Sequence, residues 1–144
     1  MKAIYAGSFD PFTIGHEWIA GRALEIFDSL VIAIGINESK KNERSIEARI
    51  EKIRTVFKDN PRVEVVSYKG LTAELAKSVG AGVLVRGVRN SIDFEKEKEL
   101  ADINLEILGV PTVMIPSPPS LSYISSSMVR ELSHFGEDIS RFEP

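Results

Sequence analysis

The chain has 144 residues, 43% of them hydrophobic, and its 18 lysines and arginines against 21 aspartates and glutamates give a net charge of −3. A chain of this length buries roughly two thirds of its unfolded surface, so we expect residues 1–144 to form a single domain without disulfides or a structural metal. The absence of cysteine excludes disulfide frameworks, thiolate nucleophiles and cysteine zinc sites, and the slightly acidic balance argues against a protein that mainly binds nucleic acid.

No segment predicts export or membrane insertion. The apolar stretch at the amino terminus is too short for a signal peptide. The uncharged window 107–129 is long enough to span a bilayer, but it contains four prolines and six serines, so we expect a segment with loops. The default expectation is a cytoplasmic protein without a membrane or nucleic-acid partner.

Short β-branched runs alternate with longer helical stretches along the whole chain, which is typical of βαβ units in a parallel sheet. In chain order the predicted elements are a strand at 3–5, a helix at 15–27, a strand at 30–36, a helix at 46–57, a strand at 63–68, a helix at 71–79, a strand at 83–85, a helix at 91–108, a strand at 112–115 and a helix from about 125 or 126 to Gly136. The tail up to Pro144 is predicted to be irregular. This order predicts an open, doubly wound α/β domain with a five-stranded parallel sheet and helices on both faces.

Cap residues support several of these boundaries. Ser45 is a good cap for the helix predicted at 46–57, and Pro61 prevents that helix from continuing. Gly80 and Gly109 stand where helices end, and glycine best tolerates the left-handed conformation found there.

The loops that follow the predicted strands carry the chemistry. In such a sheet, ligands bind outside the carboxyl ends of the strands. The loops there hold turns at 7–16, Lys40 and Lys41, two arginines at 86–89 and a run of prolines and serines at 116–127. Cationic side chains and exposed backbone N–H groups at helix starts suit a polyphosphate ligand. The chain lacks a Walker P-loop and a GxGxxG turn, so a P-loop NTPase or a dinucleotide dehydrogenase is not expected.

Two segments are more specific: TIGH at 13–16 and ISSSMVR at 124–130. They resemble the (H/T)xGH and ISSSxxR signatures of the nucleotidylyltransferase superfamily. The likeness extends to the phosphopantetheine adenylyltransferase family through YAGSFDP at 5–11, SKK at 39–41, RGVR at 86–89 and DFE at 93–95. These motifs cover nearly the whole chain in the expected order. The resemblance implies a Rossmann-like nucleotidylyltransferase fold and adenylyl transfer from ATP to 4′-phosphopantetheine, which gives dephospho-coenzyme A and pyrophosphate in the penultimate step of coenzyme A biosynthesis.

The resemblance also implies which residues form the site. It assigns catalysis to His16, Lys40 and Arg89. It assigns ATP binding to Ser8, Phe9, His16, Gly87, Val88, Arg89, Glu97, Leu121, Ser122, Tyr123, Ile124, Ser125, Ser126 and Ser127. It assigns acceptor binding to Ser8, Lys40, Thr72 and Arg86. The family usually has proline in place of Ala6 and often threonine in place of Ser8, so this chain keeps the hydroxyl and relaxes the turn.

Each of these residues also has a purely structural interpretation. The dipole at a helix start disfavours a charged His16, which can still donate a hydrogen bond to a phosphate, whereas a lone histidine there is more often structural. Lys40 can follow a phosphate as it transfers, but paired lysines in polar loops are usually solvated. Arg86 and Arg89 can grip phosphates with their guanidinium forks, although arginines are common at strand ends. Asp10 fits turn chemistry as well as function.

The helix at 91–108 begins with alternating acidic residues at 93, 95, 97 and 99. Because alternate residues do not share a helix face, we expect a solvated helix and no metal cage. The resemblance implies that Glu97 alone among these acids contacts the nucleotide. Mg²⁺ is expected to arrive bound to ATP, since it keeps most of its waters. The resemblance further implies a homohexamer, possible feedback binding of coenzyme A, and chains that usually continue past the position of Pro144 into another helix.

Two other functions stay open at this point. One is a related nucleotidylyltransferase that uses CTP or a nicotinamide mononucleotide acceptor, although the RGVR segment and the short chain favour the pantetheine branch. The other is a nucleotide sensor on the same fold that binds ATP and does not turn it over.

Overall fold

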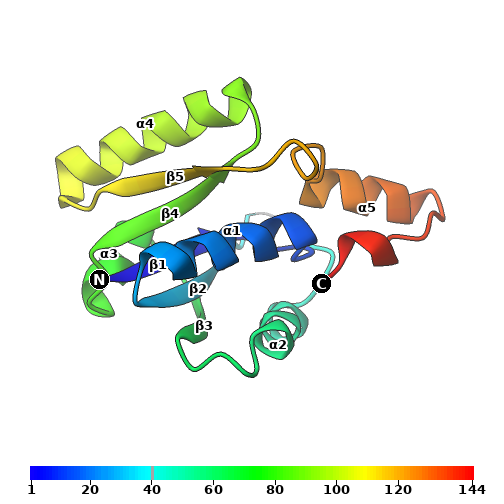
Figure 1. The fold of residues 1–144 in the computed structure, drawn as a ribbon, viewed down its shortest axis with the longest axis horizontal. Coiled ribbons are helices and arrows are strands. Elements are labelled where there is room, and N and C mark those ends of the chain that lie inside the picture. Colours follow the sequence, from blue (N-terminus) through cyan, green and yellow to red (C-terminus); the bar gives the residue numbers. More distant parts are fainter. Residues whose placement is uncertain (40) are drawn as a thin grey trace.

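The computed structural model describes residues 1–39 and 41–144, and it confirms the predicted parallel sheet with helices on both faces (Figure 1). The strands are β1 (Lys2–Gly7), β2 (Ser29–Gly35), β3 (Val63–Tyr68), β4 (Val83–Val88) and β5 (Thr112–Pro116). The helices are α1 (Ile14–Ile26), α2 (Ile46–Val56), α3 (Thr72–Ser78), α4 (Ser91–Leu108), α5 (Ser126–His134) and the short 3-10 helix η1 (Ser140–Phe142). Every long element therefore lies within a few residues of its predicted place.

The strand order is β3-β2-β1-β4-β5, and all neighbouring strands are parallel. The chain builds outward from β1 to β3, then returns to the other side of β1 and builds outward again to β5. β1 and β4 are therefore the neighbours at which the direction of growth reverses. In open α/β sheets this switch point is where ligands bind.

β1 and β4 pair over only three residues, the last pair being Tyr5 with Val85. Beyond that pair, β1 continues to Gly7 against β2 alone, and β4 continues to Val88 against β5 alone. The two central strands thus part at their carboxyl ends. The sequence placed the end of β4 at residue 85, but the strand is longer because its pairing with β5 extends to Val88.

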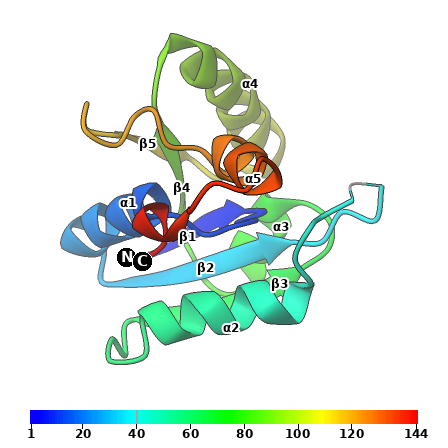
Figure 2. The same ribbon diagram turned by 90° about the vertical axis from the view of Figure 1, so that its right-hand side faces the viewer.

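The two faces of the sheet bury alternate residues, as the strand period requires. Ala3 and Tyr5 belong to the cluster that packs under α1 and α2. Ile4 and Ala6 face the opposite way, against α3 and the end of α4. Figure 2 shows α1 and α2 on one side of the sheet and α3 and α4 on the other.

α5 and η1 lie beyond the carboxyl ends of the strands (Figure 1). Phe142 of η1 is 2% exposed and packs with Ile124 and Val129. This burial orders a tail that the sequence predicted to be irregular. The signal for it was a single aromatic residue, too little to define an element from the sequence.

Caps form where the sequence predicted them. The Ser45 hydroxyl accepts a hydrogen bond from the backbone N–H of Ala48 at 3.1 Å. Gly80 and Gly109 have φ values of 74° and 70°, in the left-handed region. These residues fix where helices start and stop, and so where the intervening loops emerge.

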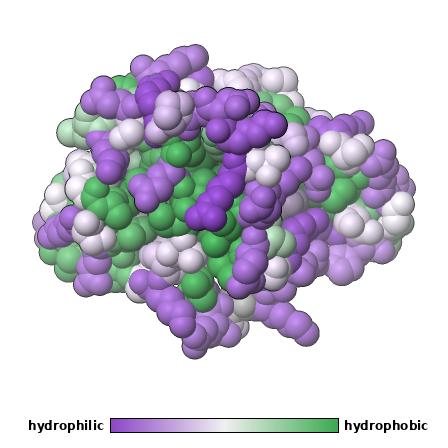
Figure 3. Space-filling model, turned by 90° about the horizontal axis from the view of Figure 1, so that it is seen from below, coloured by the Kyte–Doolittle hydropathy of each residue, from purple (hydrophilic) through white to green (hydrophobic). Residues whose placement is uncertain are grey.

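β3 is one exposed edge of the sheet, and α2 lies next to it. A groove of about 510 Å³ between them is lined partly by Phe57, Val63 and Val65. Figure 3 views the molecule from this side and shows apolar surface between hydrophilic segments. Arg54 donates from Nη2 to the carbonyl of Val65 at 3.3 Å. This bond satisfies one backbone carbonyl of the edge strand β3. None of the helices in the described part of the chain has the length and hydropathy that crossing a bilayer requires.

The core cluster under α1 and α2 predicts how two isoleucines differ. Ile32 is 0% exposed in β2, whereas Ile26 is 61% exposed at the end of α1. Ile32→Ala should lower the free energy of unfolding by about 2–5 kcal/mol, because it removes buried methyl groups and leaves a cavity. Ile26→Ala should stay within about 0.5 kcal/mol of the parent. Urea unfolding followed by circular dichroism measures both, and equal losses would contradict this assignment of the core.

Candidate functional site

A cavity of about 300 Å³ opens where β1 and β4 part. The end of β1, the start of α1, the end of β4, the first turns of α4 and the start of α5 all contribute to its walls. The lining includes Tyr5, Gly7, Ser8, Phe9, His16, Arg86, Gly87, Arg89, Asp93, Glu97, Ile124, Ser125, Ser126, Ser127 and Arg130. Most of the residues that the sequence predicted for nucleotide and acceptor are therefore brought to one place.

His16 is held by the residue that caps its helix. Thr13 accepts at Oγ1 from the backbone N–H of His16 at 3.4 Å, and the Thr13 backbone N–H donates to Nδ1 of His16 at 2.9 Å. A backbone N–H can only donate, so Nδ1 is the unprotonated nitrogen of the ring. The proton of the neutral imidazole therefore sits on Nε2, which makes Nε2 a hydrogen-bond donor.

Three aromatic rings enclose this imidazole. Phe12 stacks on it with ring centroids 5.5 Å apart, Phe9 meets it edge-on at 5.1 Å, and the Tyr5 ring lies 6.4 Å away. Burial, with a further contribution from the cations Arg86 and Arg89, lowers the pKa of His16 from 6.5 to about 4. His16 is therefore neutral near pH 7, and burial is the largest reason for it.

The turn after β1 is tightly constrained. Phe9 has a φ of 48°, in the left-handed region that non-glycine residues seldom adopt, and its ring is buried at 3% exposure. A Cβ on Gly7 would come within 3.1 Å of that ring, so a larger residue here would have to displace the ring by a few tenths of an ångström. The Phe9 ring packs in the core cluster under α1 and α2, directly after Ser8 in this turn.

Arg86 in β4 and Arg89 just after it each form an ion pair with an acidic residue of α4. Arg86 donates from Nε and Nη2 to the two carboxylate oxygens of Glu97, each at 2.8 Å, and from Nη1 to the carbonyl of Ala6. Arg89 donates from Nε to Asp93 at 3.0 Å and from Nη2 at 3.3 Å. The bond to Ala6 bridges the gap where β1 and β4 part.

α4 has no buried residue, as expected for a solvated helix, but Asp93 differs from the expectation because it is half-buried and paired with an arginine. Asp93 and Glu97 are four residues apart, so they share a helix face, and they pair with Arg89 and Arg86 respectively. Glu95 and Glu99 are exposed. Asp93 is a site residue that the sequence interpretation missed, and its i,i+4 spacing from Glu97 was the available signal.

The three serines at the start of α5 have distinct tasks. Ser125 caps the helix by accepting from the backbone N–H of Met128 at 3.1 Å. Ser126 donates its hydroxyl to the carbonyl of Pro11 at 2.8 Å, and Ser127 accepts from Nη2 of Arg130 at 3.3 Å. The positive end of this helix therefore lies at the cavity, fixed to the turn after β1.

The remaining predicted residues lie around the cavity or outside the described chain. Lys40 falls outside the described residues. Thr72 lines two neighbouring cavities of about 240 and 680 Å³ and shares a 2.6 Å hydrogen bond with the Tyr68 hydroxyl. Four residues predicted to contact ATP do not line the 300 Å³ cavity: Val88, Leu121, Ser122 and Tyr123. They lie at the end of β4 and in the segment that leads to α5.

Sequence comparisons show which known proteins the chain resembles. Residues 4–132 match the family model described as cytidylyltransferase-like. The chain is 48% identical to the phosphopantetheine adenylyltransferase of Bacteroides thetaiotaomicron over 143 residues, which cover 99% of this chain and 95% of the relative. It is 51% identical to the phosphopantetheine adenylyltransferase of Porphyromonas gingivalis, with 99% and 93% of the two chains covered. The protein of the same name from Flavobacterium psychrophilum is 46% identical, with 99% and 95% covered.

The lowered pKa of His16 predicts a pH dependence of stability. Between pH 6.5 and about 4 the unfolded chain binds a proton at this residue and the folded chain does not. Protonation therefore favours the unfolded chain in this range. The stability that neutral His16 contributes to the fold is fully present above pH 6.5 and is lost as the pH falls towards 4. Urea unfolding of the parent and of His16→Asn across this range measures it. The difference between the two proteins should change with pH, and a constant difference would contradict the shift.

Proposed function

Because the chain belongs to the phosphopantetheine adenylyltransferase family, it is a nucleotidyltransferase of coenzyme A biosynthesis, and we propose that the cavity between β1 and β4 joins ATP to 4′-phosphopantetheine. The products are dephospho-coenzyme A and pyrophosphate. One observation carries this assignment: a neutral His16 with its proton on Nε2 shares the cavity with two arginines and the start of α5.

The reaction needs alignment and charge stabilisation more than acid-base chemistry. An oxygen of the acceptor phosphate forms a bond to the α-phosphorus of ATP as the bond from that phosphorus to the bridging oxygen of pyrophosphate breaks. The acceptor phosphate is largely a dianion at neutral pH and needs no general base. Positioned hydrogen-bond donors then stabilise the charge that builds on the α-phosphate.

The residues divide this work by position. His16 donates from Nε2 to the α-phosphate, and Arg89 and Lys40 neutralise charge at the reacting centre. Ser8, Phe9, Gly87, Val88, Glu97 and the segment 121–127 bind ATP, with the start of α5 facing its β- and γ-phosphates.

The proposed position of the acceptor follows from two cavities that share lining residues. Ser8 and Arg86 line both the 300 Å³ cavity and the 680 Å³ cavity that reaches Thr72. An acceptor whose arm lies along Thr72 therefore brings its phosphate to Ser8 and Arg86, beside the α-phosphate.

Several further properties belong to the same proposal. The two carboxylates that line the cavity, Asp93 and Glu97, are both engaged by arginine, so Mg²⁺ enters on the phosphates of ATP rather than on the protein. The family resemblance supports a homohexamer, feedback binding of coenzyme A, a cytoplasmic location and a single domain over residues 1–144.

A pyrophosphate-release assay tests the reaction. The purified chain is given Mg·ATP with 4′-phosphopantetheine, with nicotinamide mononucleotide or with no acceptor, and the series is repeated with CTP. Release that requires both ATP and 4′-phosphopantetheine is expected. Release with CTP or with nicotinamide mononucleotide would assign a related activity, and silence from protein that still binds ATP would indicate a nucleotide sensor.

His16→Ala should fold normally and lose turnover. Removing one donor to a transition-state oxygen costs about 100- to 1000-fold in kcat. Steady-state kinetics measure this loss, with circular dichroism as the check on folding. A folded His16→Ala enzyme with a near-normal kcat would overturn the role given to His16.

A further inference from the structure

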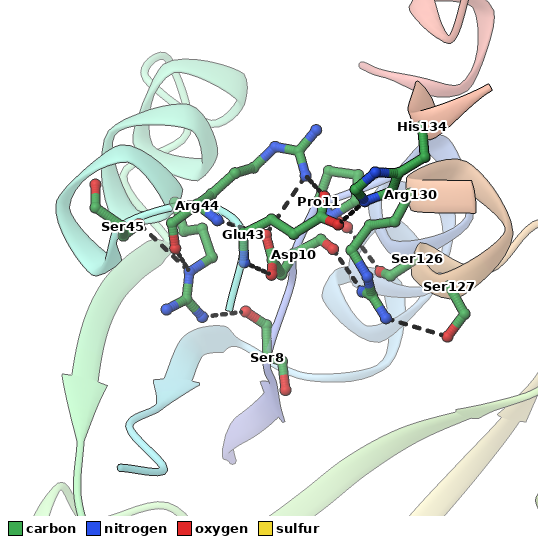
Figure 4. Close-up of polar contacts among 11 residues, drawn as sticks. Ser8, Asp10, Pro11, Glu43, Arg44, Ser45, Ser126, Ser127, Arg130 and His134 are labelled. Atoms are coloured by element: carbon green, nitrogen blue, oxygen red, sulfur yellow. Dashed lines mark hydrogen bonds and ion pairs between the residues drawn. The ribbon is translucent and has the colours of Figure 1, made fainter. Parts of the chain in front are cut away.

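Two oppositely charged side chains are buried next to the cavity without lining it. Asp10 is 2% exposed and Arg49 is 5% exposed. Charged residues are almost never this buried unless they are paired and hydrogen-bonded. Both meet their partners in the loop at residues 41–45, which follows Lys40 and leads into α2 (Figure 4).

Asp10 binds the N–H groups of this loop. Its Oδ2 accepts from the backbone N–H of Glu43 at 2.9 Å, and its Oδ1 accepts from the backbone N–H of Arg44 at 3.2 Å. The Arg44 guanidinium adds a contact from Nη1 to Oδ1 at 3.4 Å. Both carboxylate oxygens are therefore used on one loop, 33 and 34 residues away in the chain.

Arg49 binds the carbonyl groups of the same loop. Its Nε donates to the carbonyls of Arg44 at 3.1 Å and Ser45 at 3.3 Å. Its Nη1 donates to the carbonyl of Ser8 at 2.7 Å. One guanidinium thus joins the loop to the end of β1, where the acceptor and ATP sides of the cavity meet.

The turn after β1 is fixed on its other side as well. Arg130 donates from Nη1 to the carbonyl of Asp10 at 2.7 Å, and Ser126 donates to the carbonyl of Pro11 at 2.8 Å. Figure 4 shows the turn between the 41–45 loop and α5, with contacts reaching it from both. The turn is therefore a fixed base against which the loop is held.

We propose that Asp10 and Arg49 are positioning residues that hold the 41–45 loop, which follows the segment 37–39 in the wall of the 680 Å³ cavity on the acceptor side. This inference rests on the proposed function. A free loop beside the acceptor would have to be ordered at each turnover, whereas the entropy cost of ordering a loop that is already held is met when the protein folds. Asp10 and Arg49 act through the loop and touch neither substrate.

The residue types follow from the bonding pattern. The loop offers N–H groups to two oxygens at once, which a carboxylate accepts and an asparagine cannot, because one of its two positions is an NH₂ donor. The fork of Arg49 spans carbonyls on two segments, whereas a lysine has a single nitrogen. Asp10→Asn and Arg49→Lys therefore keep size or charge and release the loop.

Kinetics with both substrates test the effect on catalysis. In Asp10→Asn and in Arg49→Lys, kcat/KM for 4′-phosphopantetheine should fall about 10- to 100-fold, while KM for Mg·ATP should change less than about threefold. Because both residues hold one loop, the double variant should lose less than the product of the two single losses. Glu47→Gln, an exposed acid on α2, is the matched control and should equal the parent. Parent-like kinetics in both folded variants, or equal losses for both substrates, would overturn the proposal.

Limited trypsin digestion tests the loop itself, without reference to activity. Cleavage after Lys41 or Arg44, followed by mass spectrometry, should be at least about tenfold faster in Asp10→Asn and Arg49→Lys than in the parent and in Glu47→Gln. Unchanged cleavage in folded variants would overturn the proposal. Should Asp10→Asn fail to fold, Arg49→Lys decides both tests. An inactive parent whose variants are still cleaved faster would refute the proposed function and leave the docking of the loop established.

Discussion

The early end of the pairing between β1 and β4 is the constraint on which the site depends. These strands pair over three residues, while each continues against its outer neighbour. The opening between them is therefore made by rigid strands and not by loops alone. Arg86 lies in β4 at this opening and reaches across it to the carbonyl of Ala6, so a residue predicted to bind the acceptor also joins the two strands. Extra pairing of Ala6 with Arg86 would close the cavity.

Thr13 combines two tasks that proteins often divide between residues. It caps α1 and, through its backbone N–H, fixes which nitrogen of His16 carries the proton. The aromatic rings around the imidazole then keep it neutral. The stability of the first turn of α1 and the orientation of the His16 Nε2 donor are thus coupled, because any shift of the cap also moves the imidazole. The spacing of the TIGH segment follows from this coupling, since a capping residue reaches the backbone N–H of the residue three positions on.

The sequence was sufficient to predict the order and type of nearly all elements, because hydrophobic periodicity and cap residues are local signals. The predicted parallel sheet also placed the loops after β1 and β4 and the start of α5 at one edge, where the structure has them. The sequence missed what depends on pairing between distant segments: the added length of β4, set by β5, and the engagement of Arg89 by Asp93. Asp10 fitted turn chemistry equally well, because its partners lie more than 30 residues away and nothing local marks them. η1 depends on the burial of one phenylalanine against α5.

The pairing of Arg86 with Glu97 and of Arg89 with Asp93 has a consequence for selectivity among anions. With His16 neutral, each cation of β4 and its end already faces a carboxylate, so the positive charge of the cavity wall comes mainly from Arg130 and the start of α5. A small, singly charged anion gains too little to displace a bidentate carboxylate. In the proposed function, a ligand with several linked phosphate groups engages both arginines and the start of α5 together. A wall of this kind favours ligands by the number and spacing of their charges.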